Sequence, residues 1–118
     1  MKVEWVGIYE GGNITNERIH FRALVDIDLR YYAIYDSNLI DANRIFVGNR
    51  NCYWFSTQLI KAGDNVVLYT RAGSPNVEKR PNGTVFHFLF RGLAQPLYRQ
   101  NDSCAVLFEI GNWVTAKK

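Results

Sequence analysis

Cysteine and histidine are scarce in this sequence, which limits the cross-links and metal sites it can build. Its 118 residues include two cysteines, Cys52 and Cys104, and two histidines, His20 and His87. Small secreted domains that depend on disulfides carry more cysteines, and no Cys-x-x-Cys motif is present. A zinc site made from these four side chains would lack any closely spaced pair of ligands. We therefore expect two free thiols, no metal ion and no other cofactor.

Long apolar runs are missing as well. No run approaches the about 20 residues that an α-helix needs to cross a bilayer. The opening stretch MKVEWVGIYEGG is interrupted by Glu4 and Glu10, so it lacks the apolar core of a signal peptide. We therefore expect a cytoplasmic protein without a membrane partner, although a fragment of a longer protein would show the same pattern.

Motifs for phosphate binding are also absent. The sequence has neither G-x-G-x-x-G nor G-x-x-x-x-G-K, and no helix start follows Gly63-Asp64 or Gly73. A phosphate loop needs the N-terminal amides of such a helix. These glycines are therefore interpreted as turns.

The residues that carry acid–base chemistry have no obvious catalytic arrangement. His20 and His87 each fall in the middle of an expected strand, beside an arginine on the same face, which predicts half-exposed surface positions. Asp26 and Asp28 flank an expected turn, which favours capping over catalysis. We expect no enzymatic activity; an enzyme whose site leaves no sequence motif stays open as an alternative.

What the sequence does contain fits one domain rich in aromatic rings. A chain of this length suits a single domain, here residues 1–118, and 47% of it is hydrophobic and 14% aromatic. The formal net charge is +3, but the 14 Lys and Arg residues are spread along the chain, whereas nucleic-acid modules gather them on one face. Because aromatic side chains favour pleated strands, the composition indicates β-structure.

Period-two alternation and turn residues predict an all-β fold. Strands are expected at 3–10, 18–26, 29–36, 43–55 (as one or two pieces with a bend at Gly48-Asn49), 65–71, 84–92, 104–110 and 113–115. The polar stretch between the fifth and sixth of these strands contains two prolines and an Asn-Gly pair, which predicts an exposed loop at 74–83. Short strands separated by turns are typical of a β-sandwich or barrel.

Alternation also predicts which side chains face the core. In the second strand Ile19, Phe21, Ala23 and Val25 share one face, and the strand at 65–71 is apolar on both faces, which predicts a central strand. Phenylalanine occupies every second position of the sixth strand. The expected core includes Trp54 or Phe55 together with Val66, Leu68, Phe88 and Leu107.

The order of these segments resembles the lamin tail domain, an immunoglobulin-like β-sandwich, over roughly residues 18–110. The matching positions are Asp28-Leu29 before an aromatic strand, the turn Leu59 with Ala62-Gly63-Asp64, and the break Asn101-Asp102-Ser103 before Ala105-Val106-Leu107. The chain departs from the family where Gly-Trp often follows Asp-Leu, because it has Arg30-Tyr31-Tyr32 instead. The resemblance implies an antiparallel sandwich used as an interaction module, with no catalytic residues to transfer.

Neighbouring rings suggest where such a module would bind. Adjacent residues of a strand point to opposite faces, so Tyr31 and Tyr32 cannot share a side, nor can Tyr53 and Trp54. Some of these rings must therefore reach an outer surface, where rings and arginines commonly form binding hot spots. The candidate binding residues are Tyr31, Tyr32, Tyr35, Tyr53, Arg30 and Arg50.

Three interpretations of this aromatic and arginine face stay open. We expect a non-enzymatic binding or structural module whose partner is a protein. The alternative is that this face binds nucleic acid or carbohydrate, since rings also stack on bases and sugars. A covering loop, or a second copy of the chain in a homodimer, would also account for rings on an outer face.

Overall fold

The fold consists almost entirely of strands joined by turns. The computed structural model describes residues 1–48 and 50–118. The elements of this part are β1 (Val3–Tyr9), β2 (Arg18–Ala23), β3 (Ile27–Asp28), the single 3-10 turn η1 (Leu29–Tyr31), β4 (Tyr32–Asp41), β5 (Arg44–Ile45), β6 (Cys52–Trp54), β7 (Leu59–Ile60), β8 (Asn65–Tyr69), β9 (Asn76–Lys79), β10 (Val85–Phe90) and β11 (Ser103–Glu109). No helix in these residues is long and apolar enough to cross a bilayer.

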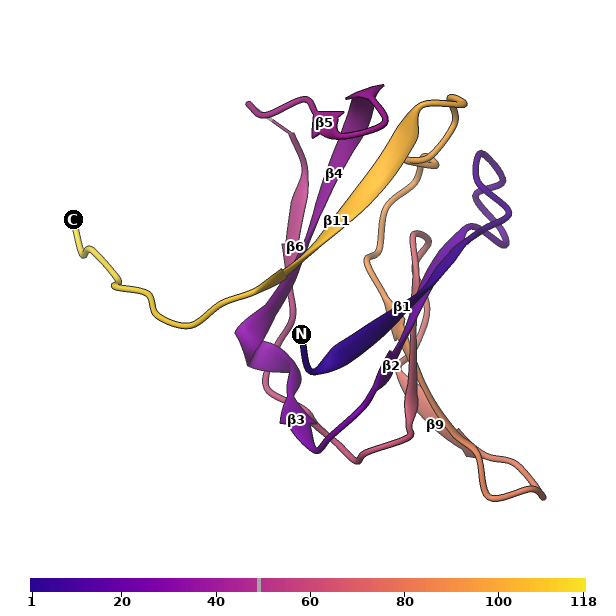
Figure 1. The fold of residues 1–118 in the computed structure, drawn as a ribbon. Helices are drawn as coiled ribbons and strands as arrows, with labels where there is room; N and C mark the ends of the chain where they lie inside the picture. Colours follow the sequence, from indigo (N-terminus) through magenta and orange to yellow (C-terminus); the bar gives the residue numbers. More distant parts are fainter. Residues whose placement is uncertain (49) are drawn as a thin grey trace.

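Two layers of strands face each other (Figure 1). The first layer is a five-stranded sheet in the order β1-β2-β8-β10-β9, and the second has β4 between β11 on one side and β5 and β6 on the other. The short pair β3–β7 forms a third, two-stranded sheet. This confirms the expected all-β sandwich. One pair departs from an antiparallel arrangement, because β8 and β10 run parallel and β9 forms the edge beyond them.

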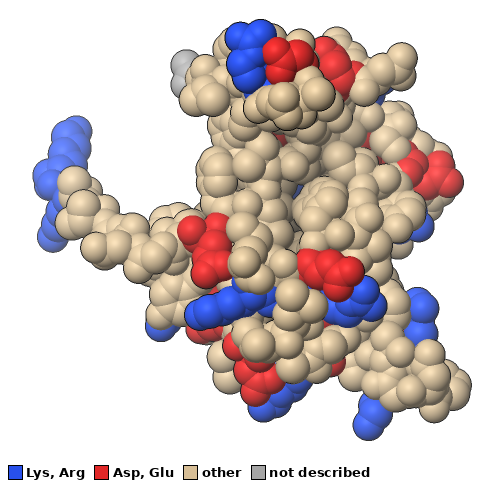
Figure 2. Space-filling model, viewed as in Figure 1, with Lys and Arg blue, Asp and Glu red and all other residues tan. Residues whose placement is uncertain are grey.

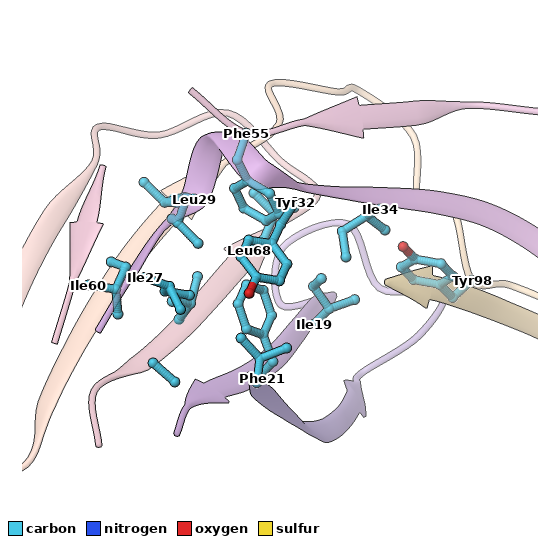
Figure 3. Packing of buried hydrophobic residues seen from close by; sticks show 14 residues of the cluster. Ile19, Phe21, Ile27, Leu29, Tyr32, Ile34, Phe55, Ile60, Leu68 and Tyr98 are labelled. Atoms are coloured by element: carbon cyan, nitrogen blue, oxygen red, sulfur yellow. The ribbon is translucent and has the colours of Figure 1, made fainter. Parts of the chain in front are cut away.

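The core fills the space between the layers (Figure 3). The expected alternation of the second strand is confirmed at Ile19, Phe21 and Ala23, which are all buried. β8 is buried on both faces and lies between β2 and β10, as expected of a central strand. The cluster of buried residues is Val3, Ile19, Phe21, Ala23, Ile27, Leu29, Tyr32, Ile34, Phe55, Ile60, Val66, Leu68, Leu89 and Tyr98.

The expected orientation of β10 was wrong. Phe88 is on the outer face and only partly buried, while His87 and Leu89 point inward and are buried. The His87 imidazole can be buried because it has polar partners. Its Nε2 lies 2.8 Å from Oδ2 of Asp64, and Gln58 Nε2 donates to its Nδ1 over 3.3 Å. Buried polar groups with such partners avoid most of the desolvation cost.

Other core expectations hold in part. Of the alternatives Trp54 and Phe55, it is Phe55 that is buried, at 3% exposure, whereas Trp54 is 49% exposed. Leu107 is only partly buried and packs against the core cluster. Val25 is exposed, because β2 ends at Ala23 before reaching it.

The segment 74–83 is exposed, but it is a hairpin rather than an open loop. β9 pairs antiparallel with β10, and Gly83 occupies the turn with a φ of 86°. The turn closes through hydrogen bonds from Gly83 N to Arg80 O and from Arg80 N to Thr84 O. The region 43–55 splits into two strands, β5 and β6, as expected. The bend was expected at Gly48-Asn49, and Asn49 lies outside the described residues.

Two buried acidic residues tie the layers and loops together. Glu17 is fully buried, and its carboxylate accepts hydrogen bonds from three backbone N–H groups and from the Thr70 hydroxyl. Asp36 on β4 accepts from Arg91, which follows β10 in the opposite layer, and from the hydroxyl of Tyr98 over 2.6 Å. We call these last three residues the polar pin, because they connect the two layers through the core.

Candidate functional site

The outer face of the β11-β4-β6 sheet carries exposed rings. The strand register places Trp54 and Phe108 on either side of Ala33, with all three side chains directed outward. Trp54 is 49% exposed and Phe108 is 42% exposed. Exposed rings side by side on a sheet face are a common mark of an interaction surface.

Three further rings extend this surface. Tyr35 stacks on Phe108 at a centroid distance of 6.0 Å, and Trp113 packs edge-on against Trp54 at 5.1 Å. Tyr31 lies 5.7 Å from Trp113. We call the five residues the tryptophan face: Tyr31, Tyr35, Trp54, Phe108 and Trp113.

Backbone and arginine contacts hold the rings of this face in place. The indole N–H of Trp54 donates to the carbonyl of Arg30 over 2.6 Å, and the Arg30 guanidinium donates to the Tyr31 hydroxyl over 2.8 Å. The same guanidinium lies 4.8 Å from the centre of the Tyr31 ring. Arg30 therefore occupies the rim of the face, where a charge affects association rate more than affinity.

The structure brings together only part of the candidate residues. Tyr31 and Tyr35 belong to the tryptophan face, and Arg30 lies at its rim. Tyr32 was wrongly placed there, because alternation along β4 turns its ring into the core, where it is 2% exposed. Tyr53 points the same way, packing edge-on against Phe55 with centroids 5.0 Å apart.

Arg50 lies away from these rings and stacks on another. Its guanidinium is 3.8 Å from the centre of the Phe46 ring, at the opposite end of the sheet from Arg30. Tyr35 marks the boundary between the two ends, since its hydroxyl is hydrogen-bonded to the backbone of Gly48. Sequence reasoning missed Phe108 and Trp113, although the alternation of the expected strand at 104–110 could have identified Phe108 as outward-facing.

The edge of the sheet beside this face is open. In the antiparallel register of β11 with β4, Ile110 N donates to Tyr31 O and Leu39 N donates to Asp102 O, so the even-numbered residues of β11 make the ladder bonds. The odd-numbered residues direct N–H and C=O away from β4. In the described part of the chain, the backbone groups of Ala105, Leu107 and Glu109 have no hydrogen-bond partner.

This edge also lacks the charges that usually protect such strands. β11 reads Ser-Cys-Ala-Val-Leu-Phe-Glu, with its single charge at the last position. Figure 2 shows Lys, Arg, Asp and Glu above and below the surface over β11, which is uncharged along most of its length. Natural edge strands without Lys, Pro or a bulge are prone to pair with another chain.

A hollow of about 530 Å³ lies at the end of β11. Apolar side chains form much of its wall, among them Ile27, Tyr32 and Ile60. Glu109 is also part of the wall, and burial together with this carboxylate raises the pKa of Tyr32. Because Tyr31 borders both the hollow and the tryptophan face, the two are continuous.

The described residues contain no cluster of three or more His, Cys, Asp or Glu side chains that could hold a metal ion. Cys52 and Cys104 are both unpaired, and the register explains this, since they lie on β6 and β11 with β4 between them. Asp28 caps η1 by accepting from Arg30 N, which confirms the capping role expected for it. Asp26 accepts instead from Ala62 N, on a segment distant in the sequence.

Comparisons with protein families, with curated proteins and with solved structures found no match to this chain. The surfaces themselves are therefore the basis for a functional proposal.

Proposed function

We propose that this chain is a non-enzymatic recognition module that binds an extended, apolar segment of a protein partner along the open edge of β11. The observation that carries the proposal is the position of this edge directly beside the tryptophan face. Strand addition obtains affinity from main-chain hydrogen bonds and specificity from alternate side chains of the added strand. Here the alternate side chains would contact Phe108 and Trp113 on one side.

The hollow at the end of β11 would take an anchor side chain. Its volume of about 530 Å³ falls in the range of ligand pockets, and the apolar part of its wall suits an aliphatic or aromatic group. Charged residues also line it: Lys2, Asp26, Asp28, Lys61 and Glu109. Deeply seated anchors supply most of the energy at protein interfaces. A segment paired with β11 would reach the hollow where Glu109 and Ile110 border it.

The immunoglobulin-like, lamin-tail-domain-like assignment of the sandwich is likewise our proposal, supported by the segment order over residues 18–110 and by the two packed layers. For the compartment we propose the cytoplasm, where thiols stay reduced, in keeping with the unpaired Cys52 and Cys104. Neither assignment is needed for the binding proposal.

A peptide-display selection tests the binding proposal directly. Random linear peptides selected on the folded domain are expected to alternate apolar and polar residues, and to shift the backbone amide resonances of Ala105, Leu107 and Glu109. Ala105→Pro should abolish their binding, because it removes an N–H that the fold does not use and that the added strand requires. The thermal midpoint should change little.

Val77→Pro is the matched control. Val77 lies on β9, the exposed edge of the other layer, and the β9–β10 register leaves its N–H unpaired as well. This variant should bind the selected peptides as the wild type does. Peptides that bind Ala105→Pro with unchanged affinity would refute the proposal. A dimer of the chain itself, seen by light scattering and lost in Ala105→Pro, would refute it in favour of a second copy as the occupant.

A further inference from the structure

The outer face of the five-stranded sheet carries a second group of rings, interleaved with arginines. Register places Tyr9, Arg18, Tyr69 and Phe90 in one row across β1, β2, β8 and β10. The neighbouring positions of the same face add His20 and the two other phenylalanines of β10. We call the set the arginine–ring face: Tyr9, Arg18, His20, Tyr69, Arg71, Arg80, Phe86, Phe88 and Phe90.

Guanidinium groups lie on the rings of this face. The Cζ atom of Arg18 is 5.3 Å from the centre of the Tyr9 ring and 6.0 Å from that of Tyr69. Arg71 lies 4.8 Å from Tyr69 and 5.0 Å from Phe90. These distances are those of cation–π contacts, so each of the two arginines lies against two rings of the row.

Rings in the middle of the face pack in stacked pairs. Tyr69 and Phe90 stack with their planes 14° apart, and Phe86 and Phe88 stack with theirs 15° apart. Arg80 covers the Phe86 ring at 3.8 Å. Aromatic rings beside planar cations suit a ligand that is itself aromatic and negatively charged.

Two of the arginines have no carboxylate partner among the described residues. Arg18 donates to the carbonyl of Asn16, and Arg71 donates to the carbonyls of Thr15 and Ala72, but no acidic group lies within ion-pair distance of either. The other arginines of this sheet differ: Arg22 pairs with Glu4 and Arg80 pairs with Glu78. The uncompensated positive charge is therefore concentrated on the Tyr9–Phe90 row.

A shallow hollow of about 270 Å³ opens between these groups. Tyr9, Arg18 and His20 form one side of it, and Arg80 and Phe86 are on the other. The space can take one planar ring system but not a double helix, whose bases are stacked and paired inside. A base that is already unpaired can enter it without that cost.

We propose that the arginine–ring face binds single-stranded nucleic acid, with Arg18 and Arg71 on the phosphates and the rings stacking on the bases. Phosphate supplies the negative charge that these two guanidinium groups lack, and unpaired bases match the flat rings. A neutral sugar would leave both charges uncompensated. This site is on the opposite side of the sandwich from the tryptophan face. Its test is therefore independent of the test of the protein-binding proposal.

Fluorescence anisotropy with a labelled oligothymidylate of about 12 nucleotides, within the usual range for single-stranded sites, tests the proposal. Two phosphate contacts predict a slope of log affinity against log salt of about −1.4, since each contributes about −0.7 on a single strand. Affinity should therefore fall about sevenfold between about 50 and 200 mM NaCl. A duplex of the same length should bind more weakly.

Single variants separate this site from general positive charge. Arg18→Gln and Arg71→Gln should each weaken binding about eightfold at about 50 mM salt and reduce the slope by about 0.7. Tyr9→Leu should weaken binding with the slope unchanged, because it removes stacking and no charge. Arg22→Gln, on the same strand but ion-paired, and Arg30→Gln, in the other layer, are the matched controls and should bind as the wild type does.

Several results would overturn the proposal. It is wrong if the single strand does not bind at low salt, or if the duplex binds as tightly or more tightly. It is also wrong if Arg18→Gln and Arg22→Gln lose the same amount of affinity, because this would indicate diffuse electrostatic attraction. If a neutral oligosaccharide displaces the oligonucleotide and its own binding is weakened by the same substitutions, the face is a sugar site instead. The thermal midpoint of each variant is measured as well, and a midpoint equal to that of the wild type shows that a loss of binding comes from the face and not from unfolding.

Discussion

Replacement of Glu17 by glutamine tests how much of the fold depends on one buried carboxylate. The two oxygens of Glu17 accept four hydrogen bonds: from Gly12 N at 2.8 Å and Tyr98 N at 3.0 Å on one oxygen, and from Thr70 Oγ1 at 2.5 Å and Leu97 N at 2.8 Å on the other. Glutamine has nearly the same shape, but it replaces one acceptor oxygen with an amide that can only donate.

The magnitude follows from the number of donors left without an acceptor. Glutamine should place its NH₂ group toward Thr70, because the hydroxyl can accept from it, and the remaining oxygen keeps Gly12 N and Tyr98 N. Leu97 N is then the donor left without an acceptor. A buried donor without a partner costs about 1–3 kcal/mol, so Glu17→Gln should lower the free energy of unfolding by about 1–3 kcal/mol. Domains of this kind have about 5–15 kcal/mol in total, so the loss is a large fraction of stability.

The loss should also depend on pH. Burial raises the pKa of Glu17, but the hydrogen bonds from Gly12, Thr70, Leu97 and Tyr98 outweigh it, so the pKa is lowered from its usual value near 4.5. A lowered pKa in the folded state means that the ionised carboxylate stabilises the fold fully above the unfolded value. This contribution is lost as the pH falls through the folded value. Glutamine does not titrate, so the difference between the two proteins should shrink in acid.

Urea unfolding followed by tryptophan fluorescence measures both effects, at neutral pH and at steps down through the acid range. Glu10→Gln is the matched control, because Glu10 is an exposed glutamate in the same loop and should change stability by less than about 0.5 kcal/mol. The reasoning is refuted if Glu17→Gln is as stable as this control at neutral pH. It is also refuted if the difference from wild type is the same at all pH values.

Three further predictions follow from burial, edges and thiol environments. Phe21→Ala should lower the free energy of unfolding by about 3–5 kcal/mol in urea titrations, because this ring is fully buried. Trypsin should first cut the native domain after Lys79, on the exposed edge strand β9, and mass spectrometry of early fragments would reveal any other first site. With a thiol reagent at mildly alkaline pH, Cys52 should react before Cys104, since burial and nearby carboxylates raise the pKa of Cys104. Comparison of Cys52→Ser with Cys104→Ser assigns the fast phase.

Local alternation was enough to predict most of the longer strands and much of the core, but not β3, β7 or β9. β2 shows why: its apolar residues fall strictly at every second position, and Ile19 and Phe21 are both buried. β8 is apolar on both faces, and only a central strand between two neighbours can bury both. Such patterns depend on a few consecutive residues, so the sequence alone determines them.

The face of β10 could not be predicted in the same way. Three phenylalanines on one side look like a core pattern, yet a buried His87 with Asp64 and Gln58 as partners occupies the inside. These partners are 23 and 29 residues away in the sequence. Cation–π contacts from Arg71 and Arg80, which follow the ends of β8 and β9, then make the outer position acceptable for Phe90 and Phe86.

The candidate site was predicted only in part for a similar reason. Alternation correctly required one ring of Tyr53 and Trp54 to face outward, but it could not say which, and it does not apply to Tyr31, which lies in η1 rather than in β4. The choice depends on where β4 and β6 place their inward residues. The strand expected at 113–115 was wrong, because the chain makes no ladder there, and so alternation could not indicate the contact of Trp113 with Trp54.

The polar pin of Asp36, Arg91 and Tyr98 has a consequence for the uniqueness of the fold. Two purely apolar layers can slide past each other by one pair of residues and still bury the same surface. In this domain such a slide would separate Asp36 from Arg91, whose nitrogen and oxygen atoms lie 2.9 Å apart inside the core, and breaking a buried pair costs about 3–5 kcal/mol. The pin therefore selects one alignment of the layers. We expect a well-packed apolar replacement of Asp36 and Arg91 to keep the domain folded while broadening its amide resonances, as several alignments become accessible.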